Sequence, residues 1–237
     1  MSELKAVLFD LDDTLFDHRH SSRCGLQLFQ ERYKEFAAVP LDELELLNLS
    51  LLNTIHAEVL SGAITVDEAR LRRFGILFRS HSINLTDKEL LEASDLYRRK
   101  YLDSRRATPG AIELLKELRV RGLTIGVVTN NVVEEQLDKL RDCGLNPLVD
   151  SVTISEAVGV AKPHPRIFEI GLEGVGCAAT ETVMIGDSWT SDVLGARSAG
   201  IRPIWYNCYD LEIPDKNVPE IGSFEDTAAA LAIILRA

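Results

Sequence analysis

The chain has 237 residues, of which 46% are hydrophobic and 27% are charged, and its formal net charge is −11. This composition is typical of a globular protein with a substantial core. The negative charge argues against a general nucleic-acid surface or an acidic membrane as partner, since both attract positive charge. It leaves a small anionic substrate possible, because a pocket can be locally positive.

The cysteines and the apolar runs bear on where the protein works. Cys24, Cys143, Cys177 and Cys208 are widely spaced and form no C-x-x-C pair, so we interpret them as free thiols in a reducing compartment. The first predicted strand begins close to Met1, and no apolar run approaches the roughly 20 residues that span a bilayer. We therefore expect a cytoplasmic protein without a signal peptide.

The first predicted strand, residues 5–10, is followed by a long interval that contains no convincing strand. Helical spacing fills this interval, and Thr65 with Glu68 and Thr86 with Glu89 form two apparent capping boxes. A single crossover needs only one helix, so we expect an inserted helical subdomain. The predicted domains are an α/β catalytic core, residues 1–16 and 104–237, and a helical cap, residues 17–103.

Strands and helices alternate in the rest of the chain. Further β-branched runs lie at 123–129, 182–187 and 201–206, with a weaker run at 148–155. Helical patterns lie at 109–121, 132–143, 165–175, 189–199 and 224–236, and the Pro-rich segment 212–222 is predicted to be a surface loop. This alternation predicts an α/β fold, a doubly wound Rossmann-like parallel sheet.

Polar side chains gather where the predicted strands end. In open α/β sheets, ligands bind outside the carboxyl ends of the strands. The residues at these positions are Asp10, Asp12 and Thr14 after the first strand, Thr129 and Asn130 after the second, Lys162 ahead of a helix, and Asp187 and Asp192 near the fourth. The carboxyl edge therefore collects several carboxylates, a hydroxyl and a lysine.

This set of residue types fits phosphoryl transfer. Mg²⁺ prefers oxygen ligands, usually one or two carboxylates with water and phosphate oxygens. A carboxylate can attack phosphorus to form an aspartyl-phosphate, and the reaction depends mainly on positioning and charge neutralisation. Lys162 and the metal would neutralise the phosphate, while Thr129 and the backbone N–H groups after Asp10 and Thr129 would cradle its oxygens.

The segments DLDDT, TN, KP and GDSWTSD, in this order, resemble the four motifs of the haloacid dehalogenase (HAD) superfamily. The helical insertion after the first motif is similar to the four-helix cap of the small-cap phosphatases. The flanks of the last motif resemble the nucleotidase and acylneuraminate-phosphatase branches. Two positions depart from the family pattern: His164 follows KP where many relatives have Asp, and Asn131 follows TN where many have Gly.

The resemblance implies a role for each matching residue. Asp10 resembles the nucleophile and Asp12 the general acid/base. The implied Mg²⁺ ligands are Asp10, the backbone carbonyl of Asp12, and Asp187; the implied phosphate-binding residues are Thr129, Asn130 and Lys162; and Asp192 has a supporting role.

Several readings compete. The first is a Mg²⁺-dependent phosphatase acting on a small phosphorylated metabolite, a nucleoside 5′-monophosphate before a sugar phosphate. The second is a haloacid dehalogenase, although these relatives lack the second aspartate of the first motif and need no metal. A phosphomutase and a non-catalytic binding protein on the same fold are further alternatives. Residues His18, Arg19, His20 and Arg23 favour a solvated helix face over a ligand contact. The sequence gives no oligomeric state.

Overall fold

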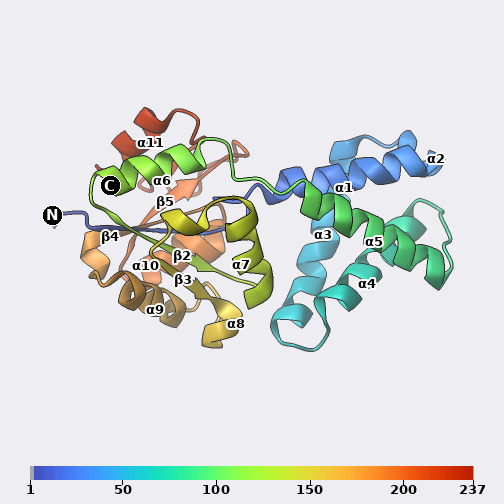
Figure 1. Cartoon of the computed structure of the whole chain (residues 1–237), viewed down its shortest axis with the longest axis horizontal. Coiled ribbons are helices and arrows are strands. Elements are labelled where there is room, and N and C mark those ends of the chain that lie inside the picture. Colours follow the sequence, from blue (N-terminus) through green and yellow to red (C-terminus); the bar gives the residue numbers. More distant parts are fainter. Residues whose placement is uncertain (1–2, 237) are drawn as a thin grey trace. The chain divides into compact units, whose positions relative to one another are not determined.

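The computed structural model describes residues 3–236, with all their side chains except those at positions 56, 57 and 60. The chain divides into two units (Figure 1). The first unit consists of Met1–Asp17 and Arg106–Ala237 and contains the sheet, and the second unit, His18–Arg105, is helical.

The sheet of the first unit has six strands in the order β3-β2-β1-β4-β5-β6, all paired in parallel. The strands are β1 (Ala6–Phe9), β2 (Thr124–Thr129), β3 (Ser151–Ile154), β4 (Thr182–Gly186), β5 (Arg202–Tyr206) and β6 (Glu220–Ile221). The chain runs from β1 to one edge and then returns to the other side of β1. The strand order therefore reverses between β1 and β4, which is where ligands bind in such sheets.

Helices cover both faces of this sheet (Figure 1). They are α6 (Ala111–Val120), α7 (Val133–Asp142), α8 (Ser155–Val158), α9 (Pro165–Val175), α10 (Gly195–Ser198) and α11 (Thr227–Ile234), with short turns η1 (Asn146–Leu148) and η2 (Ala179–Glu181) and a π-helix, η3 (Trp189–Leu194). Ile167 and Phe168 of α9 are buried in one cluster with Leu8 and Val128 of the sheet. The doubly wound α/β fold predicted from the sequence is confirmed.

One local prediction for the first unit was wrong in part, and another needs a finer description. The segment 212–222 is not entirely a loop, because Glu220–Ile221 pairs with β5 as a two-residue edge strand. Such a strand is too short to show a periodic pattern. The helical pattern at 189–199 is confirmed as η3 continued directly by α10, although its spacing did not predict that the first part is a π-helix.

The second unit consists of α1 (His18–Arg32), α2 (Lys34–Ala37), α3 (Leu41–Leu60), α4 (Val66–Ser80) and α5 (Asp87–Asp103). Both capping boxes expected from the sequence are formed, with Thr65 opening α4 and Thr86 opening α5. Aromatic rings fill the interior, and Phe29 of α1 lies 5.2 Å from Phe74 and 5.7 Å from Tyr97 between ring centroids. The unit therefore has a hydrophobic core of its own.

The two segments of the first unit that flank residues 18–105 lie side by side. Asp17 N–H donates to the carbonyl of Arg106 at 3.1 Å, and the Arg106 guanidinium donates to Asp17 Oδ2 at 2.9 and 2.7 Å. Thr108 N–H donates to the carbonyl of Leu15 at 2.8 Å. These contacts, which we call the neck, lie within the first unit.

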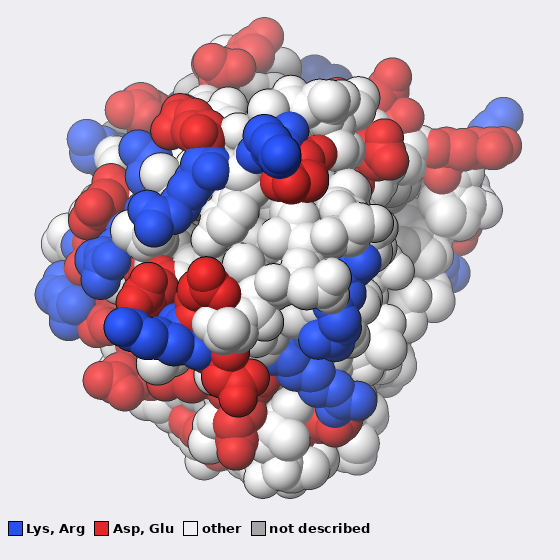
Figure 2. Space-filling model, turned by 90° about the vertical axis from the view of Figure 1, so that its right-hand side faces the viewer, with Lys and Arg blue, Asp and Glu red and all other residues white. Residues whose placement is uncertain are grey.

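Charges of both signs mix on the surface. Acidic and basic side chains are interspersed on the face shown in Figure 2. On α1, Arg19 Nε lies 2.5 Å from Glu45 Oε1, and Arg23 pairs with the same carboxylate. This pairing is consistent with the helix-face interpretation of the α1 cations. No helix in the described part of the chain is long and apolar enough to cross a membrane.

Candidate active site

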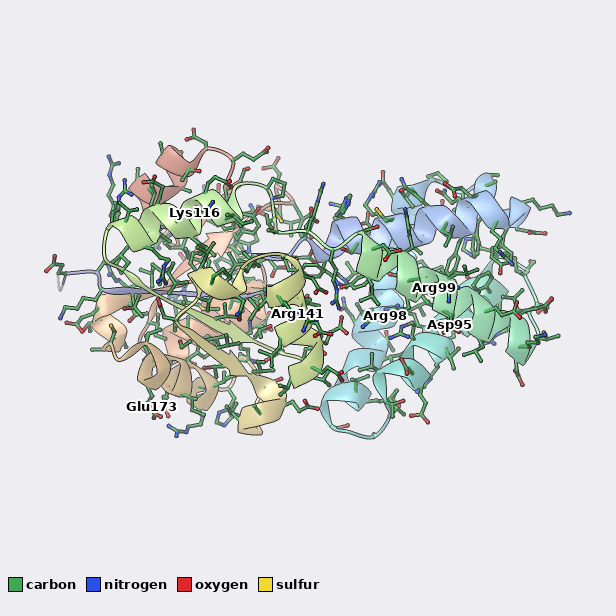
Figure 3. The ribbon with its side chains drawn as sticks, viewed as in Figure 1. Asp95, Arg98, Arg99, Lys116, Arg141 and Glu173 are labelled. Atoms are coloured by element: carbon green, nitrogen blue, oxygen red, sulfur yellow. The ribbon has the colours of Figure 1, made fainter. Side chains whose placement is uncertain are left out.

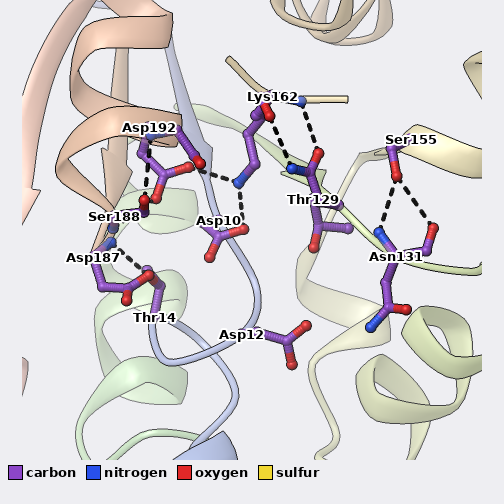
Figure 4. A network of polar contacts seen from close by, with 12 residues as sticks. Asp10, Asp12, Thr14, Thr129, Asn131, Ser155, Lys162, Asp187, Ser188 and Asp192 are labelled. Carbon is purple, nitrogen blue, oxygen red and sulfur yellow. Dashed lines mark hydrogen bonds and ion pairs between the residues drawn. The ribbon is translucent and has the colours of Figure 1, made fainter. Parts of the chain in front are cut away.

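The centre of the candidate site is a buried lysine between two aspartates (Figure 4). Lys162 Nζ lies 2.5 Å from Asp10 Oδ1 and 2.6 Å from Asp192 Oδ1. Asp10 directly follows β1, and its N–H donates to the carbonyl of Ile185 on β4, so it stands where the strand order reverses. Asp192 comes from η3, whose wide turn carries its side chain to the lysine. Such π-turns are frequent at functional sites.

Asn130, at the end of β2, holds the backbone of Lys162. Its side-chain oxygen accepts the Lys162 N–H at 2.8 Å and its side-chain nitrogen donates to the Lys162 carbonyl at 3.0 Å. The amide group of Asn130 is therefore engaged with the lysine segment, and a phosphate contact from this residue remains a prediction for its backbone N–H.

Asp187 completes a group of three carboxylates. It follows β4, and its N–H donates to Thr14 Oγ1 at 3.1 Å (Figure 4). Carboxylate oxygens of Asp10, Asp187 and Asp192 all lie within 4.8 Å of one another. A Cβ at Gly186 would lie 2.3 Å from Asp192 Oδ2, so the absence of a side chain there lets Asp192 approach. The structure thus brings together carboxylates from the two ends of the range Asp10 to Asp192.

The charge balance of this group favours a cation. Burial raises the pKa of Asp10 to about 7. Lys162 opposes this shift, whereas the negative charges of Asp192 and Asp12 add to it. Burial and the neighbouring Asp10 likewise raise the pKa of Asp187 well above its usual range. Burial alone would lower the pKa of Lys162, but Asp10 and Asp192 outweigh it and raise that pKa. The single positive charge of Lys162 therefore does not balance the negative charges of three carboxylates. Their oxygen atoms are ligands of the kind that Mg²⁺ prefers.

Asp12 and Thr129 lie on the α7 side of the site. Lys139 Nζ lies 2.6 Å from Asp12 Oδ1, and Gln136 donates to Asp12 Oδ2 at 3.0 Å and to Thr129 Oγ1 at 2.6 Å. Sequence reasoning missed Gln136 and Lys139. Their signal was present but weak, because both share the buried face of α7 with Leu140 at i, i+3 and i+4 spacing.

The two departures from the family pattern have local explanations. Asn131 has φ 154°, a region that glycine adopts more freely, and its backbone is held by Ser155, whose Oγ accepts the Asn131 N–H at 3.0 Å (Figure 4). His164 precedes α9, and its Nδ1 accepts the N–H of Arg166 at 3.2 Å. Aspartate is a common N-cap with the same acceptor role, so His164 replaces it as a cap.

Comparisons with known proteins agree with this architecture. A profile of the haloacid dehalogenase-like hydrolase family matches residues 4–200. The chain is 31% identical to the HAD-hydrolase YfnB of Bacillus subtilis, over 93% of this chain and 90% of that protein. It is 32% identical to the pyrimidine 5′-nucleotidase YjjG of Escherichia coli, over 90% of each chain. It is also 32% identical to a glyceraldehyde 3-phosphate phosphatase of Methanothermobacter thermautotrophicus, over 92% of each.

Solved structures show the same likeness. The crystal structure of B. subtilis YfnB superposes with a TM-score of 0.74 at 27% identity, covering 98% of this chain and 100% of that one. Dehalogenase structures at 18% and 19% identity reach TM-scores of 0.75 and 0.76 and share the fold. From its sequence motifs, its strand order and these matches together, the chain belongs to the haloacid dehalogenase-like hydrolase family of enzymes.

Proposed function

We propose that the protein is a Mg²⁺-dependent phosphatase that hydrolyses a small phosphomonoester through an aspartyl-phosphate intermediate. The observation that carries the proposal is the group of three clustered carboxylates, Asp10, Asp187 and Asp192, with one buried lysine between two of them. This arrangement offers a carboxylate nucleophile, a fixed positive charge and oxygen ligands for a divalent cation at one place.

The residues would act in two steps. Asp10 attacks phosphorus while Asp12 gives a proton to the leaving oxygen. Water then attacks the phosphorus of the aspartyl-phosphate while Asp12 takes a proton from that water, and Asp10 is regenerated. Lys162, Thr129 and the Asn130 N–H would hold the phosphoryl oxygens.

The metal site would consist of Asp10, the backbone carbonyl of Asp12, and Asp187, with Asp192 orienting Lys162. A bound Mg²⁺ would offset the negative charge of the carboxylates and of the phosphoryl group. The solved structure of YfnB is described as bound to magnesium, which supports this choice of ion.

The dehalogenase alternative shares the nucleophile but not the remaining residues. Asp12 as a proton carrier and Asp187 as a ligand have no use in a reaction that needs neither a metal nor a leaving alcohol. The curated relatives that we compare include a nucleotidase and a phosphatase, which also favours phosphate esters. A phosphomutase would differ in that a second substrate hydroxyl replaces water.

We propose a small phosphorylated metabolite in the cytoplasm as the substrate, a nucleoside 5′-monophosphate before a sugar phosphate. The pyrimidine 5′-nucleotidases YjjG and PynA, both 32% identical to this chain, support the first choice. The helical unit, residues 18–105, would serve as a cap that excludes water and selects the leaving group.

The test is phosphate release from a panel of phosphomonoesters, assayed with Mg²⁺ and with EDTA. The panel contains nucleoside 5′-monophosphates, sugar phosphates and glyceraldehyde 3-phosphate, and 2-haloacids are scored for halide release. Phosphate release that requires Mg²⁺ is the expected result. Halide release that persists in EDTA, or no phosphate release from folded protein, would overturn the proposal.

A further inference from the structure

The side chain of Asp12 is held by two residues of α7 that have no part in the mechanism above. Lys139 Nζ lies 2.6 Å from Asp12 Oδ1, and Gln136 Nε2 lies 3.0 Å from Asp12 Oδ2. The two α7 residues also contact each other, with Lys139 Nζ 2.7 Å from Gln136 Oε1. Each carboxylate oxygen of Asp12 therefore has its own donor from one helix.

Burial makes this arrangement unlike an ordinary surface ion pair. The Lys139 side chain is 2% exposed, and Gln136 is fully buried. A buried ammonium is costly unless a carboxylate and further acceptors compensate it, so its position is tightly constrained. Arg141 on the same helix gives the contrast (Figure 3): its side chain is 67% exposed, and it pairs with Asp138 on the surface.

Gln136 also links the proposed proton donor, Asp12, to a proposed phosphate-binding residue, Thr129. Its Nε2 donates to Thr129 Oγ1 at 2.6 Å as well as to Asp12. One amide therefore sets the distance between a residue that would bind the phosphoryl group and the residue that would move the proton. Misplacing a reacting group by 1 Å can cost about 100-fold in rate, so this spacing matters for turnover.

We propose that Lys139 and Gln136 are positioning residues that orient the Asp12 carboxyl toward the leaving oxygen of the substrate. The inference rests on the proposed function, because it assigns a purpose to these residues only if Asp12 transfers a proton. They contact the side chains of Asp12 and Thr129 and are assigned no contact with the substrate, so they act through those two side chains.

The test compares substrates that need a proton on the leaving oxygen with one that does not. The variants are Lys139→Met and Gln136→Met, with Arg141→Met as the matched control for loss of a cation from α7. One substrate is the alkyl phosphomonoester that the wild-type enzyme hydrolyses fastest in the panel. The other is p-nitrophenyl phosphate, whose nitrophenolate departs without a proton, and its release is followed by rapid mixing during the first turnover.

With the alkyl ester, Lys139→Met should lower kcat by about 100-fold while KM changes by less than about threefold. The first-turnover release of nitrophenolate should fall by less than about threefold, because proton donation contributes little to that step. Lys139→Arg, which keeps a cation, should recover at least about tenfold of the lost kcat, and Arg141→Met should match the wild type.

Equal losses with both substrates, or no loss with either, would overturn the inference and leave the proposed function intact. Failure of the wild-type enzyme to hydrolyse any phosphomonoester would overturn the proposed function, and this inference with it. Thermal unfolding reports whether each variant is folded. If Lys139→Met does not fold, the same substrate comparison on Gln136→Met and Lys139→Arg decides the question.

Discussion

Asp10 and Asp192 both pair with Lys162. Lys162 therefore keeps one carboxylate partner when the charge of Asp10 is removed by a substitution of the same size. Asp10→Asn keeps the volume and one oxygen of the side chain but removes the carboxylate that we propose as the nucleophile. We expect kcat to fall by on the order of 10⁴-fold or more, while the thermal unfolding temperature does not decrease, because one of three crowded carboxylates has been neutralised. Steady-state phosphate release and thermal unfolding measure the two effects. Turnover within tenfold of the wild type would assign the attack to another group.

A second prediction at this scale concerns Asp187. Asp187→Asn should weaken Mg²⁺ binding by at least about tenfold, because a neutral amide replaces an anionic oxygen ligand. Calorimetric titration of Mg²⁺ into the apoprotein measures this directly, independently of turnover. Glu173→Gln on the exterior of α9 is the control for loss of one negative charge (Figure 3). An unchanged Mg²⁺ affinity in Asp187→Asn would show that Asp187 is not a ligand.

Some residues of the candidate site can be predicted from the sequence, whereas others cannot. Asp10, Asp187 and Lys162 stand at strand ends or ahead of a helix, so their type and place together predict a site. Gln136 and Lys139 lie inside a helix, where polar residues normally face water. Their contact with Asp12 joins α7 to the loop after β1, more than 120 residues away along the chain, and no local pattern predicts it.

At the scale of elements, Asp150 joins three of them just before β3. Its carboxylate accepts the Ile125 N–H of β2 at 2.8 Å and pairs with Arg119 of α6 at 2.7 Å. Partial burial would raise the pKa of Asp150, but these two partners outweigh it and hold the pKa below its usual value. The folded state therefore binds the Asp150 proton less readily than the unfolded state does.

Asp150→Asn should consequently destabilise the protein at neutral pH, by about 1–3 °C in unfolding temperature for a partly exposed pair. A lowered pKa gives stability that is fully present above the ordinary Asp pKa and is lost as pH falls through the folded-state value. The difference between Asp150→Asn and the wild type should therefore shrink below about pH 4. Glu117→Gln, from the surface pair with Arg121, is the control. A difference that stays constant with pH would contradict the assignment.

The elements themselves were predicted unevenly for identifiable reasons. The apolar runs of β1, β2, β4 and β5 marked each strand to within a residue at either end, because buried parallel strands have no polar alternation to confuse the pattern. The π-helix η3 was read as part of a regular helix. Its wide turn places Asp192 beside Lys162, a contact that residue spacing alone does not predict.

At the scale of the whole molecule, the helical unit is one continuous stretch with its own aromatic core. Inside it, Phe29 contacts the rings of Phe74, Phe78 and Tyr97, and Phe74 also contacts Tyr97. We expect residues 18–105 expressed alone to fold into a helical domain that unfolds cooperatively, as judged by far-UV circular dichroism during heating. Phe74→Ala in this fragment should cost about 3–5 kcal/mol and abolish the cooperative transition. A fragment without any transition would mean that its core depends on the first unit.

The α/β class was predictable because it follows from the alternation of two periodicities over most of the chain. The division into a core, residues 1–16 and 104–237, and a cap, residues 17–103, remains a prediction about how the units work, since a cap is defined by its action on a bound substrate. Substrate identity was least accessible, because the residues that contact a leaving group follow no fixed spacing in one sequence.

The neck has a consequence for how such an enzyme can diversify. Asp17 and Arg106, which flank residues 18–105 in the sequence, are hydrogen bonded to each other within the first unit. The chain therefore leaves and re-enters this unit at neighbouring positions. Closing a loop there costs entropy that grows only slowly with loop length. The segment between Asp17 and Arg106 can therefore become longer or shorter, or be replaced by another domain, without changing the pairing of the strands. If the helical unit selects the substrate, as we propose, a change of substrate need not begin with a change in the residues that carry out the reaction.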